Sequence, residues 1–468
     1  MAGKTMFEKI WDDHVVAQMH EGVYLLHIDR HIIMESACAP AFAGLSERGL
    51  KVRNPELTFA TIDHIVSTMP GRTGETFAGG TELVRLIRQN TAENGVRLFD
   101  IDDPRQGIVH VVAPEQGIAL PGTTVVCADS HTPSSGGLGA LAWGIGTSET
   151  EHVFATQMLL QRKPKQMRVL FEGALAPGVT AKDMVLYLIG QIGVSAGRGY
   201  AVEYGGSAVR SLSIEGRVTI CNMSIEFGAK FGFVAPDSLT YDYLRCKPYA
   251  PKGADWERAI EQWRRLPSDD GAIFDQQVTI DCGEISPQVS WGSTPEEVIG
   301  IDQHIPDLSS AEDSERRKAW ENSLAYQGLL PGQQMEGVPI DVAFIGSCTN
   351  GRLSDLKDAA RVVRGRRVAA GVRALVVPGS SQVKREAETA GLDKIFLDAG
   401  FEWREAGCSM CISINDDIVA PGARCIATSN RNFQNRQGPG SRTHIASPAM
   451  VAAAAVSGKI TDVRAYLN

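Results

Sequence analysis

The sequence predicts an α/β fold. Short apolar runs typical of buried strands alternate with segments whose apolar residues recur at helical spacing, as residues 340–347 do with residues 352–363. Polar residues follow such strands directly, as Asp63 and His64 follow residues 57–62, and α/β folds place their ligands at the carboxyl ends of strands. A length of 468 residues suggests about three domains.

The other predicted elements follow the same alternation. Runs rich in branched apolar residues predict strands at 23–28, 107–112, 123–128, 167–171, 212–214, 374–377 and 424–428. Helical spacing predicts helices at 6–17, 83–94, 181–192, 382–390 and 449–456. Ser447 and Pro448 open the last of these, and the glycine-rich residues 135–146 are expected to form a loop with a tightly packed helix. Residues 241–271 and 312–318 are expected to be surface helix.

The composition excludes several classes of protein. No run of about 18 apolar residues occurs, so no membrane-spanning helix is expected, and residues 1–11 lack the apolar segment of a secretory signal. The net charge of −9 argues against nucleic acid as a partner, and it implies that an anionic substrate depends on a local group of arginines. Nine cysteines at irregular spacing fit a reducing cytoplasm better than a disulfide framework.

Three cysteines form the most informative pattern. Cys408 and Cys411 are a Cys-x-x-Cys pair, which can bring two thiolates to one metal centre, and Cys348 follows a predicted strand. Four sulfurs would close a zinc or iron–sulfur site, whereas three leave a position open for Lewis-acid catalysis. Two alternatives stay open: a zinc site with His444 or Cys425 as fourth ligand, and a redox pair, which would normally lie in a small βαβ domain.

Two imidazoles are expected beside acids at strand ends. His64 follows Asp63 after one predicted strand, and His131 lies two residues after Asp129 at the end of another. A neighbouring carboxylate can orient an imidazole and stabilise its charged form, which suits acid–base catalysis. The alternative is that both histidines have structural or surface roles.

Two further acids and an amide are candidates for the same site. Glu149 is expected in the first turn of a helix with a capping box of Ser148 and Glu151, so its alternative role is a favourable charge at that N-terminus. Asn222 and Glu226 are four residues apart on one face of a predicted helix. A carboxylate among apolar neighbours is costly to bury unpaired, and the alternative is a partly exposed helix acid.

A polar loop follows the predicted strand at residues 424–428. It contains Asn430, Arg431 and Arg436. Two arginines five residues apart can form paired hydrogen bonds with carboxylates, although exposed arginines are also common on any surface.

Together these motifs resemble the aconitase superfamily, over essentially the whole chain. The resemblance rests on Gly346-Ser347-Cys348-Thr349-Asn350, Gly407-Cys408-Ser409-Met410-Cys411, and Ser429-Asn430-Arg431-Asn432-Phe433 with Arg436. It implies three αβα-type domains around an iron–sulfur cluster, at residues 1–165, 166–300 and 301–468, with the swivel domain of the superfamily absent from this chain.

The resemblance also implies roles for individual residues. A 4Fe–4S cluster with one iron lacking a protein ligand is expected on Cys348, Cys408 and Cys411. The expected catalytic residues are Asp63, His64, His131, Glu149 and Glu226. The expected substrate-binding residues are Asn222, Asn430, Arg431 and Arg436.

The implied activity is that of a hydro-lyase of leucine biosynthesis, which interconverts 2-isopropylmalate and 3-isopropylmalate by dehydration and rehydration. Residues 37–40 depart from that branch, because they read Ala-Cys-Ala-Pro where Thr-Ser-Pro-Gln is expected, so Pro40 replaces a substrate-contacting glutamine. This departure motivates an alternative, a maleate- or citraconate-type hydratase. A cluster-bearing RNA-binding regulator, which the negative charge opposes, and a zinc-bound structural protein are more distant alternatives.

A partner is expected as well. The superfamily takes its base from a serine, with an arginine, in a Gly-Ser-Ser-Arg-Glu-like run of the swivel domain. Residues 379–382 read Gly-Ser-Ser-Gln and lie between a predicted strand and a predicted helix. The resemblance therefore predicts a heterodimer in the cytoplasm, in which a small swivel-domain subunit supplies the serine and the arginine.

Overall fold

The computed structural model describes residues 3–467, which form two compact units. Unit 1 comprises the chain up to Ile65, Gly74–Gly173 and Ser195–Ile280, and unit 2 comprises Val66–Thr73, Ala174–Val194 and the chain from Asp281 onwards. The expected division into three domains remains a prediction. Its middle domain contributes to both units, because helix α6 (Ala181–Ile192) belongs to unit 2.

Unit 1 is built on a five-stranded parallel sheet with the order β5-β4-β3-β6-β7. Its strands are β3 (Arg30–Met34), β4 (Thr58–Thr61), β5 (Arg97–Phe99), β6 (Thr124–Cys127) and β7 (Leu141–Gly144). The first strand in sequence lies in the middle and later strands add on both sides, as in doubly wound folds, which bind ligands beyond the carboxyl ends of the central strands.

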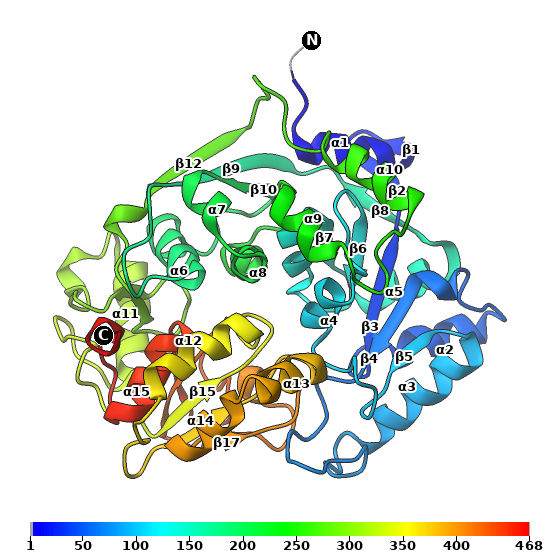
Figure 1. The fold of residues 1–468 in the computed structure, drawn as a ribbon. Coiled ribbons are helices and arrows are strands. Elements are labelled where there is room, and N and C mark those ends of the chain that lie inside the picture. Colours follow the sequence, from blue (N-terminus) through cyan, green and yellow to red (C-terminus); the bar gives the residue numbers. More distant parts are fainter. Residues whose placement is uncertain (1–2, 468) are drawn as a thin grey trace. The chain divides into compact units, whose positions relative to one another are not determined.

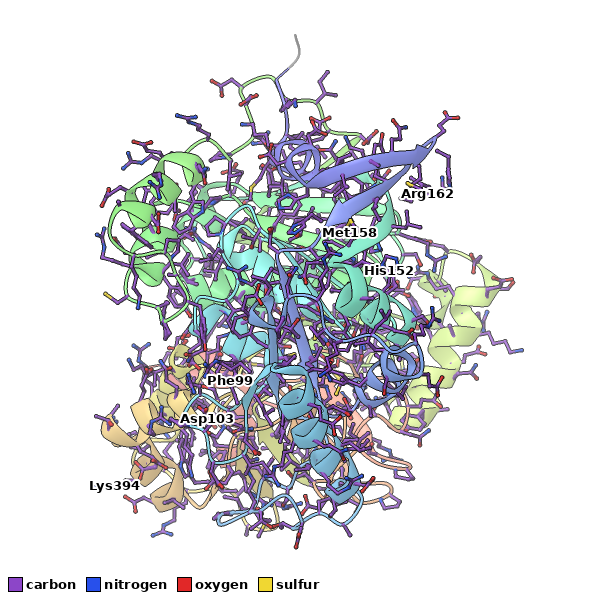
Figure 2. The ribbon with its side chains drawn as sticks, turned by 90° about the vertical axis from the view of Figure 1, so that its right-hand side faces the viewer. Phe99, Asp103, His152, Met158, Arg162 and Lys394 are labelled. Atoms are coloured by element: carbon purple, nitrogen blue, oxygen red, sulfur yellow. The ribbon has the colours of Figure 1, made fainter. Side chains whose placement is uncertain are left out.

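Two smaller sheets complete the strands of unit 1. The order β11-β10-β9-β12 joins β9 (Lys165–Glu172), β10 (Tyr200–Gly205), β11 (Phe231–Val234) and β12 (Gln276–Asp281). An antiparallel sheet joins β1 (Val15–His20), β2 (Val23–His27) and β8 (Met158–Arg162). Figure 2 labels His152 of helix α5 (Thr147–Thr156) close to Met158 of β8, and the His152 ring is 2.7 Å from the Met158 carbonyl oxygen.

The helices of unit 1 are short and pack their apolar residues against these sheets. Besides α5 they are α1 (Met6–His14), α2 (Ala39–Glu47), α3 (Thr81–Asn94), α4 (Val109–Glu115), α7 (Ser207–Ser211), α8 (Ile214–Asn222), α9 (Ser238–Leu244) and α10 (Ala254–Trp263).

Unit 2 repeats the central sheet of unit 1. Five parallel strands have the order β17-β16-β15-β18-β19, again with the first strand in the middle. They are β15 (Val342–Ile345), β16 (Arg373–Val376), β17 (Glu402–Trp403), β18 (Arg424–Ala427) and β19 (Arg442–Ile445), beside the hairpin of β13 (Gln288–Ser290) and β14 (Val298–Gly300). The helices beside β15 and β17 in Figure 1 are α12 (Leu353–Val363), α13 (Ser381–Thr389), α14 (Leu392–Ala399) and α15 (Pro448–Ser457). Helix α11 (Ser314–Gln327) contacts β19.

The predicted α/β class is confirmed, and most predicted elements are present within a few residues. Helix α6 has the predicted bounds, and the two parallel sheets have nearly continuous apolar strands because both of their faces are buried. None of the described helices is long and apolar enough to cross a membrane.

Two predicted strands are wrong. Residues 107–112 were expected to be extended, but α4 covers Val109–Glu115, and every residue of that helix is buried. A short run that is apolar on all sides has no periodicity that separates a buried helix from a strand. Residues 212–214 form a turn into α8, because the Ser213 hydroxyl accepts the Gly216 N–H and starts the helix.

Several helix boundaries also differ from the prediction. The first helix ends at His14, where the branched Val15 and Val16 begin β1. Helix α5 begins at Thr147, and the capping box uses Glu149 and the Gly146 N–H rather than Ser148 and Glu151. In the glycine-rich stretch, β7 replaces the expected helix, which is reduced to the 3-10 helix η2 (Thr132–Leu138).

The predicted surface helix at residues 241–271 is wrong in its burial. The structure has two short helices there, and Trp256 and Trp263 of α10 belong to the buried core of unit 1. Asn222 and Glu226 do not share one α-helix face either, because α8 ends at Asn222 and the 3-10 helix η3 (Met223–Phe227) carries Glu226.

Candidate active site

The first group of candidate residues lies in unit 1, at the carboxyl ends of β3, β4 and β6. Asp63 and His64 follow β4, and the His64 Nδ1 is 2.5 Å from Asp63 Oδ1. The other Asp63 oxygen accepts the Val109 N–H at 2.9 Å, at the start of α4. Both side chains are buried, so the carboxylate determines the orientation of the imidazole.

Glu35 holds the backbone of this pair in place. It follows β3 by one residue, is fully buried, and accepts the N–H groups of Asp63, His64 and Ile65 at 3.1, 2.7 and 2.5 Å. Burial raises the pKa of Glu35, and the neighbouring Asp63 carboxylate raises it further. One side chain therefore satisfies three successive backbone donors at the turn that carries Asp63 and His64.

Asp129 connects the three histidines of this group. Its Oδ1 is 2.7 Å from His110 Nε2 and accepts the His131 N–H at 2.7 Å, while its Oδ2 is 3.2 Å from His64 Nε2. Burial alone would raise the pKa of Asp129, but the charge and hydrogen bonds of the surrounding imidazoles outweigh it and hold the pKa of Asp129 well below its usual range. Asp129 therefore stays ionised.

His131 forms a second buried pair with Glu226. The His131 Nε2 is 2.8 Å from Glu226 Oε1, and both side chains are at most 6 % exposed. The contact joins the end of β6 to η3 and pairs an acid that would be costly to bury alone. We call Asp63, His64, His110, Asp129, His131 and Glu226 the acid–imidazole cluster.

Two other predicted site residues of unit 1 lie outside this cluster, and Asn222 supports it through Ser134. The Asn222 amide donates to the Ser134 hydroxyl at 2.8 Å, and that hydroxyl donates to the His131 carbonyl oxygen at 2.6 Å. Glu149 accepts the Gly146 N–H at 2.9 Å and the Gln161 amide at 3.2 Å. Within residues 3–467, the hydrogen bonds of Glu149 therefore cap α5 and hold β8 rather than any residue of the cluster.

The second group of candidate residues lies in unit 2, at the carboxyl ends of β15, β17 and β18. Cys348 follows β15 through Ser347, whose backbone is left-handed with a φ of 82°. A serine in that region costs roughly 1–2 kcal/mol, which the hydrogen bonds of its hydroxyl offset. That hydroxyl donates to the Thr428 carbonyl oxygen at 3.2 Å and accepts the Thr349 N–H at 3.2 Å, so the Cys348 loop is attached to the end of β18.

Cys408 and Cys411 lie on one tight turn. The Cys411 N–H donates to the Cys408 carbonyl oxygen at 3.0 Å across the 3-10 helix η6 (Ser409–Cys411). Ser409 is left-handed, with a φ of 50°, and its hydroxyl donates to the buried Asp417 at 2.8 Å. Asp417 also accepts the Thr68 hydroxyl at 2.5 Å, so it anchors the turn within unit 2.

The side-chain amide of Asn430 contacts two of the three sulfurs. The Asn430 Nδ2 lies 3.5 Å from Cys348 Sγ, and the Asn430 Oδ1 lies 3.8 Å from Cys411 Sγ. The same Nδ2 donates to the Thr349 hydroxyl at 3.0 Å, so the amide cannot rotate freely. Cys348 and Cys411 therefore converge on Asn430, and all three predicted cysteines are buried and not oxidised to disulfides.

The chain before Asn430 is held by a buried lysine. Lys182 of α6 donates to the carbonyl oxygens of Thr428 and Ser429 at 2.5 and 2.7 Å. Burial lowers the pKa of Lys182 to about 7, against the raising effect of Asp355 and Cys411. The Lys182 amine, with a pKa of about 7, thus lies near the cysteines and bonds to the backbone just before Asn430.

The two candidate fourth ligands for a zinc site have other roles. Cys425 lies inside β18 with its thiol against the Ile426 carbonyl oxygen, and burial raises its pKa well above the usual range. The His444 Nδ1 donates to the Ser290 carbonyl oxygen, and its Nε2 accepts from Arg424 at 2.6 Å. Both ring nitrogens of His444 are thus occupied, and the protonated Cys425 thiol lies buried within β18.

Arg431 and Arg436 lie in the loop between β18 and β19 that begins at Asn430. Arg431 is half-buried, and Arg436 is buried with its guanidinium 5.1 Å from the centre of the Phe433 ring. Asn432 between them donates to the Gly292 carbonyl oxygen at 2.7 Å and ties the loop to the β13–β14 hairpin.

Comparison with known proteins decides the family. Residues 8–458 match the model of the aconitase family (aconitate hydratase). This chain is a member of the aconitase family. It is also 58 % identical over 462 residues to the 3-isopropylmalate dehydratase large subunit 1 of Bradyrhizobium diazoefficiens, an alignment that covers 99 % of this chain and 97 % of the relative. Aconitase X of Thermococcus kodakaraensis in its holo form has a TM-score of 0.46 at 12 % identity, with 91 % of this chain and 89 % of that one covered.

The predicted resemblance to the aconitase family is therefore confirmed. The structure adds three residues that sequence reasoning did not select: Glu35, His110 and Asp129. Asp129 could have been selected, because it stands two residues before His131 at a predicted strand end. His110 was hidden by the wrong strand assignment at residues 107–112, and Glu35 acts on backbone groups about thirty residues away, which no local pattern reveals.

The unit 2 residues fit an iron–sulfur cluster. Thiolates are the usual ligands of such clusters, and here two buried, reduced cysteines lie against one amide, with the third on the same turn as Cys411. The left-handed Ser347 and Ser409 place two of the ligands on tight loops, as a compact multi-sulfur site requires.

Proposed function

We propose that this chain is the large, cluster-binding subunit of a 3-isopropylmalate dehydratase. Such an enzyme is a 4Fe–4S hydro-lyase that interconverts 2-isopropylmalate and 3-isopropylmalate by dehydration and rehydration in leucine biosynthesis. The observation that carries the proposal is the convergence of Cys348 and Cys411 on the Asn430 amide, with Cys408 on the same turn as Cys411. The relative with 58 % identity supports the choice of substrate.

Cys348, Cys408 and Cys411 would hold the cluster. When bound, the cluster supplies an iron without a protein ligand, which acts as a Lewis acid on the hydroxyl and a carboxylate of the substrate. Asn430 would orient two of the sulfurs through its contacts with them. Lys182, which bonds to the neighbouring Ser429 carbonyl oxygen, would offset negative charge of the thiolates.

The acid–imidazole cluster would handle the proton of the leaving hydroxyl. Protonation of a leaving oxygen needs an acid whose conjugate base is stabilised in place. His131 with Glu226, and His64 with Asp63, are imidazole–carboxylate pairs of this kind. The ionised Asp129 contacts the His64 imidazole and the His131 backbone N–H, so it would hold both histidines in place.

The remaining predicted residues would bind or orient the substrate. Arg431 and Arg436 are proposed to bind its carboxylates, since an acidic protein needs local cations to hold an anion. Asn222 is proposed to act through Ser134, which it holds against the His131 carbonyl. Glu149, first expected as a catalytic acid, is proposed to act through Gln161.

A small subunit is proposed to supply the serine base and the arginine, in a cytoplasmic heterodimer. The Gly-Ser-Ser-Gln run at residues 379–382 opens α13, and the Ser380 hydroxyl accepts the Val383 N–H at 3.0 Å as the helix cap. The relative is itself a large subunit by name, which supports a partner of this kind.

The alternative substrate class comes from residues 37–40. In the structure Cys38 precedes α2, and Pro40 lies exposed in its first turn, so this position offers a substrate neither a side-chain amide nor a backbone N–H. A maleate- or citraconate-type hydratase is therefore the comparison to include in the test.

The experiment is a substrate comparison. The chain is loaded with iron and sulfide without oxygen, mixed with its small subunit, and assayed on 3-isopropylmalate, maleate and citraconate. We expect turnover of 3-isopropylmalate to exceed that of the other two, and to fall to background without the small subunit. Preference for maleate or citraconate would establish the alternative, and full activity without a partner would contradict the proposed heterodimer.

A further inference from the structure

A small cavity in unit 1 shares a wall with the acid–imidazole cluster. Its volume is about 260 Å³, and its lining includes Asp129 and Ser130 after β6, Ile145 after β7, and Ile225 and Lys230 before β11. Asp129 is the residue that contacts His64, His110 and His131. A ligand in this cavity would therefore lie next to the proposed acid–base residues.

Lys230 is the one cation in the lining of this cavity. Its ammonium donates to the Gln161 Oε1, and this is its only hydrogen bond within residues 3–467. An ammonium has three N–H donors, so two remain for a ligand or for water. Burial lowers the pKa of Lys230, and the nearby Glu149 opposes this shift and favours the charged form.

A series of hydrogen-bonded side chains holds the Lys230 ammonium at the cavity. The Gln161 amide uses its oxygen for Lys230 and its nitrogen for Glu149 at 3.2 Å, which determines its orientation. Glu149 is anchored in turn by the Gly146 N–H at the start of α5. Gln161 is the neighbour of Arg162, which Figure 2 labels at the end of β8. A glutamate, an amide and an ammonium are thus arranged in a row that ends at the cavity.

The rest of the lining is suited to an aliphatic group. Ile145 and Ile225 present branched apolar side chains, and Ala128 lies between the strand end and Asp129. Both oxygens of Asp129 are already in contact with the histidines, so the cation and the apolar wall remain for a ligand that carries a carboxylate next to a small alkyl branch. The volume corresponds to several water molecules, which is sufficient for these two groups.

We propose that this cavity is a substrate subsite, in which Lys230 binds a carboxylate of the hydroxy acid and the two isoleucines contact its alkyl branch. This inference rests on the proposed function and deepens it. Glu149 and Gln161 are then positioning residues, because they hold the ammonium and do not touch the substrate. The chain of contacts gives Glu149 a role in the site although it lies outside the acid–imidazole cluster.

The test compares lysine variants in the complete complex of loaded chain and small subunit. Lys230→Met removes the charge at similar length, Lys230→Arg keeps a cation, and Lys163→Met is the matched control, two residues after Gln161. Lys163 lies just beyond β8 and its nearest acid is Asp12 at 3.7 Å, so it has no contact with the cavity. Kinetics with 3-isopropylmalate are combined with calorimetric titration of succinate, a dicarboxylate without a hydroxyl group.

We expect Lys230→Met to raise KM and to weaken succinate binding roughly ten- to hundredfold, with kcat changed much less. Lys230→Arg should recover part of the affinity, and Lys163→Met should behave like the unaltered complex. If Lys230→Met does not fold, Lys230→Gln takes its place in the same measurements.

Unchanged KM and succinate affinity in the Lys230 variant would overturn the subsite, and so would a fall in kcat alone. Failure of the proposed function has a different signature. In that case the unaltered complex does not convert 3-isopropylmalate, whereas the succinate titration still reports on Lys230.

Discussion

The two units contain the same sheet with different chemistry at its edge. In both, the first strand lies in the middle of five parallel strands, and most candidate residues follow the carboxyl ends of the central strands. In unit 1 these positions carry Glu35, Asp63, His64, Asp129 and His131. In unit 2 they carry Cys348 and Asn430, with Cys408 and Cys411 after β17.

The difference lies in how each set of side chains is held. In unit 1 charged carboxylates and imidazoles hold one another, as around Asp129. In unit 2 the Asn430 amide lies against two of the sulfurs, and the ionisable side chains of Arg352, Lys182 and Asp417 bond to backbone carbonyls or hydroxyls of the loops that carry the amide and the sulfurs. The same strand ends therefore suit proton transfer in one unit and metal binding in the other.

The largest expected effect is loss of the cluster, which we expect when Cys348 is replaced but not when Cys425 is replaced. Cys348→Ala should lose the visible absorbance of the cluster and reduce activity to background, because it removes a ligand. Cys425→Ala, in the buried neighbouring strand β18, should load iron as the unaltered chain does. Iron and sulfide analysis with an absorption spectrum measures both. If Cys425→Ala also lost the cluster, the assignment of three ligands would be wrong.

The next largest effect is a loss of kcat without loss of iron, which we expect when a residue of the acid–imidazole cluster is replaced. His131→Gln should lower kcat roughly 10²–10⁴-fold, the range for loss of a general acid, while iron content stays unchanged. Glu226→Gln should lower kcat less, and the double variant should be less impaired than the product of the two single effects, since the residues act as a pair. Loss of iron in His131→Gln would mean that proton transfer and metal binding are not assigned to separate units.

The smallest effect compares a buried histidine from each unit. Burial lowers the pKa of His31 in unit 1 and of His444 in unit 2 to about 3, with Arg424 adding to the shift of His444. His444 uses both ring nitrogens, whereas neither nitrogen of His31 has a hydrogen-bond partner within residues 3–467. His444→Phe should therefore destabilise the protein by ~2–4 kcal/mol, and His31→Phe should be neutral or stabilising by ~1 kcal/mol.

The pH dependence of the same variants has a definite sign. Below pH 6.5 the unfolded imidazole takes up a proton that the folded one does not, so stability falls as the pH drops from about 6.5 towards about 3. His31→Phe removes one such group, so its stability relative to the unaltered chain should increase by ~1.4 kcal/mol between pH 7.5 and pH 5.5. Urea unfolding of the cluster-free chain at both pH values measures this change. If the variant and the unaltered chain differed in stability by the same amount at both pH values, His31 would be protonated in the folded state as readily as in the unfolded state.

The sequence predicted features that depend on neighbouring residues, but it did not predict contacts between residues far apart in the chain. The cysteine spacing, the Asp63–His64 pair and helix α6 are short-range patterns, and the structure contains all three. Lys182 acts on Thr428 and Ser429, about 250 residues later in the chain, and no periodicity predicts that contact. His110 was missed for another reason: a fully buried helix such as α4 has no polar face to distinguish it from a strand.

A Mössbauer spectrum of the complex loaded with ⁵⁷Fe, recorded before and after addition of 3-isopropylmalate, shows whether one iron lacks a protein ligand. We expect one iron of the cluster to change its signal when the substrate binds, while the others keep theirs. A cluster in which no iron responds to the substrate, or a site that takes up zinc in place of iron and sulfide, would refute the proposed open iron position.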